Sequence, residues 1–302
     1  MEDEIAEIAN KSFVLYTLTP LLKFHLEPIS DRELQLKIHV CTQLKLKDTT
    51  RITRTTPGKK NEVYLGDLVD LHIEPLYFDN VASYDSTILP LKITIEIMLY
   101  KDNRNVTHTF FMLPSPYIPM YEKKADEKTF YPLILVKATS RIKSALFTWF
   151  EKRYFALCTQ LYIPPIVMTD MVNIWIESIH NLPDEDAFEE IPDMMTRPPL
   201  ILEYKTDIND LSDIKVSINQ QDAKVICKKI QDRRLFLEAF QDHILKTTSV
   251  RLRSFTFHRV SNSLATLRQD GSVKINGHAY KIFAVQLLQS WIHFAAQKVY
   301  KR

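Results

Sequence analysis

The sequence predicts an α+β protein: a curved, mostly antiparallel β-sheet with helices packed against it. Apolar and polar residues alternate over 34–46 and again over 91–99. A period of two is typical of strands with one buried face, so these runs predict the sheet. Apolar residues recur at helical spacing over 142–154 and 284–299, which predicts helices. Clustered strands beside clustered helices indicate the α+β class.

The N-terminal part of the chain is expected to consist mainly of strands. Prolines 20 and 28 end the first two strands, and prolines 114, 116 and 119 end a later hairpin, because proline removes a ladder donor. Residues 48–61 are polar and predict a solvated loop. The expected strands cover residues 13–18, 22–26, 34–46, 91–99, 106–113 and 130–136.

Helices are expected later in the chain. Ser140 and Thr169 are suitable N-caps for two of them, and Asp222 and Asp232 open two shorter ones. Strands are expected at 200–204 and 214–218. The last fifty residues read as strands followed by one helix, with Asp270-Gly271 and Asn276-Gly277 as turns of type I′.

An acidic, proline-rich segment divides the chain. Residues 183–199 contain Asp184-Glu185-Asp186, Glu189-Glu190 and several prolines, which indicates an exposed loop. We therefore expect an N-terminal sheet-and-helix half at 1–182, this loop at 183–199, and a C-terminal strand-helix dimerisation half at 200–302.

The composition argues against several classes of function. The 302 residues carry a net charge of +2, so nucleic-acid binding would need local clusters of basic residues. Three distant cysteines and the absence of a CxxC pair argue against zinc sites and disulfides. Only four glycines occur, which disfavours phosphate-binding loops. No apolar run has the length of a membrane span, so we expect no membrane association.

The sequence shows no signature of catalysis. The nine histidines include no HxH or HxxxH pair, and no GxSxG elbow is present. The carboxylates near 184–190 resemble a solvated loop more than a catalytic pair. We expect no enzyme, no cofactor and no metal. An enzyme whose site is assembled from distant residues stays open as an alternative.

The C-terminal strands are expected to pair with another protein. Residues 251–260 and 272–281 are rich in β-formers, and an open sheet edge is a natural pairing surface. The expected interface residues are Phe255, Phe257, Val260, Val273 and Ile275.

Basic residues gather at two places and are candidate DNA contacts. Lys137, Arg141 and Lys143 flank the predicted helix with Trp149. Arg251, Arg253 and Arg259 share odd parity, which on a regular strand places them on one face. Ordinary solvated charge is the alternative for both groups.

Residues 13–24 contain the run Leu15-Tyr16-Thr17-Leu18-Thr19-Pro20. This run resembles the opening motif of the centromere protein L family. Later matches keep the order and spacing of that family. They are Thr148-Trp149-Phe150, Trp175, Asp222-Ala223-Lys224, Arg259-Val260-Ser261, Asp270-Gly271, Lys274-Ile275 and His278 with Tyr280.

This resemblance implies a fold like the C-terminal domains of centromere proteins L and N. It also implies a nuclear, non-enzymatic subunit of the inner kinetochore, within the constitutive centromere-associated network, that acts in chromosome segregation. The implied partners are centromere protein N as a heterodimer, centromere protein C, other inner kinetochore subunits, and the centromeric nucleosome or its DNA. A nucleic-acid-binding β-sheet protein unrelated to centromeres is the alternative.

Overall fold

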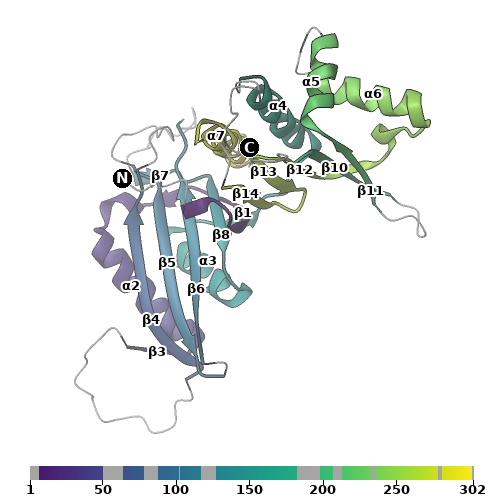
Figure 1. The fold of residues 1–302 in the computed structure, drawn as a ribbon. Coiled ribbons are helices and arrows are strands. Elements are labelled where there is room, and N and C mark those ends of the chain that lie inside the picture. Colours follow the sequence, from purple (N-terminus) through teal and green to yellow (C-terminus); the bar gives the residue numbers. More distant parts are fainter. Residues whose placement is uncertain are drawn as a thin grey trace, which may run out of the picture. The chain divides into compact units, whose positions relative to one another are not determined.

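The chain forms two compact units (Figure 1). The computed structural model describes residues 7–49, 64–77, 88–101, 103–116, 127–181, 198–206, 213–230, 232, 235–277 and 281–300. Unit 1 combines Met1–Ser12 with Leu161–Trp291, and unit 2 combines Phe13–Gln160 with Ile292–Arg302. Most of the expected loop at 183–199 lies outside the described residues, and the domain ranges 1–182 and 200–302 stay a prediction.

Unit 2 is built on a mixed sheet with the strand order β3-β4-β5-β6-β8-β1, in which β9 also pairs with β1. All of these pairs are antiparallel except the short β3–β4 pair. The strands are β1 (Ser12–Leu18), β3 (Leu46–Asp48), β4 (Gly66–Pro75), β5 (Leu91–Leu99), β6 (Arg104–Leu113), β8 (Leu133–Lys137) and β9 (Cys158–Gln160). A separate ladder joins β2 (Leu21–Leu22) to β7 (Lys128–Thr129), and the 3₁₀ turn η1 spans Phe24–Leu26.

The hairpin of β5 and β6 confirms the alternation in the sequence. Ile93, Ile95 and Ile97 are buried, while the residues between them are partly exposed. The two strands pair along their full length, from Leu91 opposite Met112 to Leu99 opposite Arg104. One face of this hairpin therefore faces the core of unit 2.

The long strand expected at 34–46 is wrong: residues Ile29–Leu44 form helix α2. Leu36 and Val40 lie four residues apart, so one helical face buries both of them completely. The other members of the alternation, Leu34 and Ile38, are left 39% and 45% exposed. Leu36 and Val40 fit both the alternating pattern and the spacing of a helix. The helix forms because it buries both side chains against the sheet.

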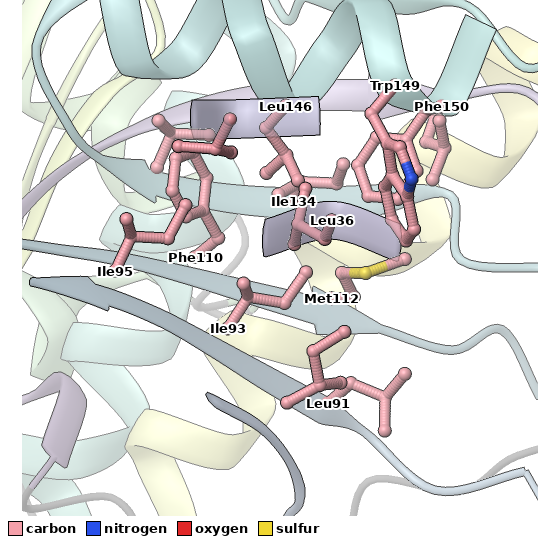
Figure 2. Close-up of a cluster of buried hydrophobic side chains, with 14 of the residues drawn as sticks. Leu36, Leu91, Ile93, Ile95, Phe110, Met112, Ile134, Leu146, Trp149 and Phe150 are labelled. Atoms are coloured by element: carbon pink, nitrogen blue, oxygen red, sulfur yellow. The ribbon is translucent and has the colours of Figure 1, made fainter. Parts of the chain in front are cut away.

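Helix α3 (Ser140–Tyr154) was predicted correctly and completes the core of unit 2. Its N-cap is Thr139 and not Ser140. Figure 2 shows Leu146, Trp149 and Phe150 of α3 and Leu36 of α2 packed with residues of β5, β6 and β8. These side chains are at most 4% exposed. Fully burying one large apolar side chain stabilises a fold by about 1.5–3 kcal/mol, so this cluster holds the two helices on one face of the sheet.

Unit 1 contains an antiparallel sheet with the order β11-β10-β12-β13-β14. Its strands are β10 (Leu200–Lys205), β11 (Ile214–Ile218), β12 (Thr256–Ser261), β13 (Ala265–Arg268) and β14 (Ser272–Ile275). Its helices are α4 (Pro165–Asn181), α5 (Gln220–Lys229) and α6 (Phe236–Thr248), and the 3₁₀ turn η5 spans Leu252–Ser254. The expected strands at 200–204 and 214–218 are confirmed.

The turn at Asp270-Gly271 differs from the expected type. Only Gly271 has a positive φ, of 80°, whereas a type I′ turn needs two such residues. The Gly271 N–H donates to the Arg268 carbonyl at 3.0 Å, and Ser272 N–H donates to Asp270 Oδ1 at 2.9 Å. The glycine is therefore needed at one position of a longer turn. His278 and Tyr280 lie outside the described residues.

The last helix, α7 (Lys281–Tyr300), follows the sheet of unit 1 as expected. Ala284, Leu288, Trp291 and Ala295 are completely buried. Gln289 and His293 lie on its exposed side. The division between the two units falls inside this helix, after Trp291.

Candidate functional site

The two outer strands of the unit 1 sheet differ in whether the chain itself occupies their rims. Beyond β14, the N-terminal segment supplies Asn10, whose N–H donates to the Ile275 carbonyl at 2.8 Å. Asn10 Oδ1 also accepts from the Gly277 N–H at 2.9 Å. A Cβ on Gly277 would overlap the Asn10 side-chain amide, so another residue at 277 would displace that amide. The rim of β14 is therefore taken by the chain itself.

The rim of β11 is open within the part of the chain that the structure describes. β11 pairs with β10 from Ile214 opposite Tyr204 to Ile218 opposite Leu200. No other described segment forms a strand pair with it. Ile214 and Val216 are partly exposed, and Lys215 and Ser217 are exposed. An open antiparallel rim presents unpaired N–H and C=O groups that another strand can complete.

The long strand β4 of unit 2 has a rim that carboxylates from β4 itself and from helix α2 block. The Leu71 N–H donates to Asp70 Oδ1 at 2.8 Å, and the Ile73 N–H donates to Glu33 Oε1 at 2.7 Å. Pro75 has no N–H, and β3 covers residues 66–68. Such carboxylates, prolines and short covering strands prevent edge-to-edge association. The contrast with β11 identifies β11 as the candidate pairing edge.

The structure does not place the expected interface side chains on a rim. Phe257, Val260, Val273 and Ile275 are at most 6% exposed, and Phe255 is partly buried. β12 lies between β10 and β13, so its backbone is paired on both sides. The expectation of a free edge at 251–260 is therefore wrong. These residues pack inside unit 1, as Phe257 does by stacking on Tyr204 with ring centroids 5.2 Å apart.

The three arginines near the C-terminus do not share one strand face. Arg251 and Arg253 lie at the 3₁₀ turn η5, where the Ser254 N–H donates to the Arg251 carbonyl, and the strand begins only at Thr256. Arg253 donates to Asp242 Oδ1 at 3.0 Å and to Gln241 Oε1 at 3.1 Å. Arg259 Nη1 lies 3.3 Å from both Glu203 carboxylate oxygens. Arg251 is exposed and has no ion pair among the described residues.

The other three predicted DNA contacts lie in unit 2. Lys137 ends β8, Arg141 lies in the first turn of α3, and both are exposed. Lys143 donates to the Tyr16 hydroxyl at 2.7 Å and lies 5.0 Å from the centroid of that ring. Of these three cations, Arg141 and Lys137 are therefore the two available to contact DNA. DNA contact by these six residues stays a prediction.

The titratable groups of the described residues give no catalytic arrangement. No group of three His, Cys, Asp or Glu side chains among them is placed to hold a metal ion. Burial lowers the pKa of His108 and of His39, which keeps both rings neutral near pH 7. Burial raises the pKa of the Cys158 thiol, so it is protonated and unreactive. None of the described helices combines the length and apolar character that a bilayer span requires.

Comparisons with known proteins identify the family. The model of the family described as centromere protein L matches residues 7–295. Centromere protein L of Homo sapiens is 20% identical over 294 residues, which cover 92% of this chain and 78% of that protein. Centromere protein L of Rattus norvegicus is 21% identical over 287 residues, covering 92% of this chain and 77% of that protein. The resemblance in the sequence is thereby confirmed, and the chain belongs to the centromere protein L family, a family of centromere proteins.

Proposed function

We propose that this chain is a non-enzymatic scaffold subunit of the inner kinetochore that pairs with centromere protein N. The open rim of β11 supports the pairing most directly, because β4 is blocked and β14 is occupied by the chain itself. A strand of the partner would extend the unit 1 sheet beyond β11. Its place of action would be the centromere in the nucleus.

Strand addition alone would not make a stable complex. β11 has five residues, and only alternate residues of a strand direct their N–H and C=O groups toward a given neighbour. Stable interfaces bury about 1,200–2,000 Å² in total, which exceeds what one short strand supplies. Helix α5 begins two residues after β11 and leaves Val225 51% exposed. We therefore include α5 in the proposed interface.

Proline substitutions in β11 test the pairing. In an antiparallel strand one parity of residues faces β10 and the other faces the rim, so Val216→Pro and Ser217→Pro should differ. The proline that replaces a residue whose N–H points to the open rim should leave unit 1 folded and abolish co-purification with centromere protein N. The proline on the other parity should destabilise unit 1. Ser217→Ala is the matched control, because it keeps the N–H and alters only an exposed side chain.

The result can contradict the proposal clearly. If both proline variants fold and bind centromere protein N as the unmodified chain does, β11 is not the pairing edge. If the unmodified chain does not bind centromere protein N at all, the scaffold proposal itself fails. Self-association through β11 would appear as a dimer of this chain alone in light scattering.

Contacts with centromere protein C, other kinetochore subunits and centromeric chromatin form a second part of this proposal. The alternative, a nucleic-acid-binding sheet protein not tied to centromeres, makes a different prediction. It requires DNA binding by the chain alone and no stoichiometric protein partner. Mass spectrometry of the proteins that co-purify from nuclear extract distinguishes the two.

A further inference from the structure

The rim strand β11 has different side chains on its two faces. Ile214, Val216 and Ile218 lie on the buried face of the unit 1 sheet, where their neighbours on β10 are at most 1% exposed. Ile218 is itself buried, whereas Ile214 and Val216 are partly exposed. The apolar face of the sheet therefore reaches the rim and ends there with two side chains that it covers incompletely.

The other face of β11 carries Lys215, which belongs to a row of charged side chains across the sheet. Strand pairing places Lys215 beside Glu203, and Glu203 beside Arg259. Arg259 Nη1 lies 3.3 Å from both Glu203 oxygens, whereas Lys215 Nζ lies 3.9 Å from one of them, beyond hydrogen-bond distance. The Lys215 side chain is 60% exposed. From Arg259 outward the row alternates in charge, and it ends at the rim on a cation that shares its carboxylate with Arg259.

We propose that β11 accepts a partner strand in which an acidic residue lies between two apolar residues. Neighbours across a strand pair lie on the same face of the sheet, and opposite charges there attract while like charges repel. The carboxylate of the partner would therefore lie beside Lys215, and the apolar side chains would cover Ile214 and Val216. The proposal rests on the pairing through β11 described above and adds the chemical class of the strand that completes it.

The same lysine disfavours a second copy of this chain at the rim. An antiparallel copy that overlaps the whole of β11 would place Lys215 beside Ser217, which has no charge to offer. Lysine on an edge strand discourages association between identical edges. A nucleic-acid backbone could approach Lys215, but it has no amide groups for the strand ladder and no apolar side chains for Ile214 and Val216. The charge thus rejects most strands and favours one class of them.

Two cyclic β-hairpin peptides test the chemistry of the partner strand. One carries Val-Thr-Val-Glu-Val in its free strand and the other Val-Thr-Val-Lys-Val, an order that suits antiparallel pairing, as in the rest of the sheet. Each hairpin is titrated into the whole isotope-labelled chain, and binding is followed by NMR at the amides of Ile214–Ile218. The acidic hairpin should bind about tenfold more tightly than the lysine hairpin, because an ion pair replaces a like-charge contact.

Charge reversal at the rim should exchange the preference between the hairpins. Lys215→Glu should bind the lysine hairpin more tightly than the acidic one and should weaken binding of centromere protein N about tenfold. Lys215→Gln should remove the preference without placing a carboxylate beside Glu203, which keeps the test valid if Lys215→Glu destabilises unit 1. Lys274→Glu is the matched control, because Lys274 is an exposed cation on β14, four strands away, or about 19 Å, beyond the screening length of about 10 Å. It should leave every affinity within about twofold.

The outcomes distinguish this proposal from the pairing with centromere protein N. Equal responses to the two hairpins, no response to either, or the same preference in Lys215→Glu would overturn the acidic strand. A dimer of the unmodified chain through β11 would also overturn it, by assigning the rim to a second copy. If the hairpins behave as expected but centromere protein N does not bind, or binds Lys215→Glu as it binds the unmodified chain, the acidic strand stands and centromere protein N is not its source.

Discussion

The carboxylate of Glu33 is predicted to protect the rim of β4, and Glu33→Ala should expose it. Glu33 Oε1 accepts the Ile73 N–H at 2.7 Å, and the side chain is 24% exposed. A hydrogen bond to a charged group contributes about 1.5–3 kcal/mol. Because water can hydrate an N–H at a sheet rim, we take the lower value, about 1.5 kcal/mol. That free energy corresponds to roughly a tenfold change in an opening equilibrium.

Hydrogen exchange measures this effect at the residue concerned. The Ile73 amide should exchange roughly tenfold faster in Glu33→Ala, while amides of β5 and β6 keep their protection. Glu74→Ala is the control, since Glu74 pairs with Lys92, at 2.7 Å, and its side chain is 50% exposed. Unchanged exchange at Ile73, or equal changes in both variants, would refute the role assigned to Glu33. Concentration-dependent association of Glu33→Ala would further support rim protection.

Three further predictions follow from the buried groups and the cations. Phe257→Ala should cost about 3–5 kcal/mol and unfold unit 1, because the ring is buried against Tyr204; exchange protection retained in unit 1 would contradict this. Burial lowers the pKa of His108 in the folded state, so its contribution to stability is present above the unfolded-state pKa of about 6.5. This contribution should be lost as the pH falls through the lower folded-state pKa. Urea titrations at several pH values should show a smaller loss in a His108→Leu variant. If DNA binds, removing Arg251, Lys137 or Arg141 should each reduce the slope of log affinity against log salt concentration by about 0.9. Arg259→Gln should instead lower stability, because Arg259 bonds Glu203. Unchanged slopes in filter-binding assays would exclude Arg251, Lys137 and Arg141 from contact with DNA.

Local patterns predicted most elements of this fold but not the order in which the strands pair. The hairpin of β5 and β6 is contiguous and its alternation is regular, so sequence reading found it. Helix α2 was missed because its i,i+4 pair Leu36 and Val40 also fits a strand with period two. The choice between the two depends on the sheet that covers α2, which lies in distant sequence.

Local sequence patterns could not identify the candidate pairing edge either. Residues 251–260 contain good β-formers, yet β12 lies inside the sheet because β10, which precedes it by about fifty residues, pairs with it. β11 was predicted as a strand, but nothing in Ile214–Ile218 indicates a rim position.

The contact of Asn10 with Gly277 has a consequence for synthesis on the ribosome. The two residues are 267 positions apart, so the N-terminal segment emerges long before its partner strand exists. At roughly 5–20 residues per second, it stays without that partner for about 13–50 s. Unit 2 likewise includes residues 292–302, so neither unit is complete until residues far along the chain from its first strands have been synthesised. The nascent chain should therefore depend on holding chaperones more strongly than a protein whose units are contiguous.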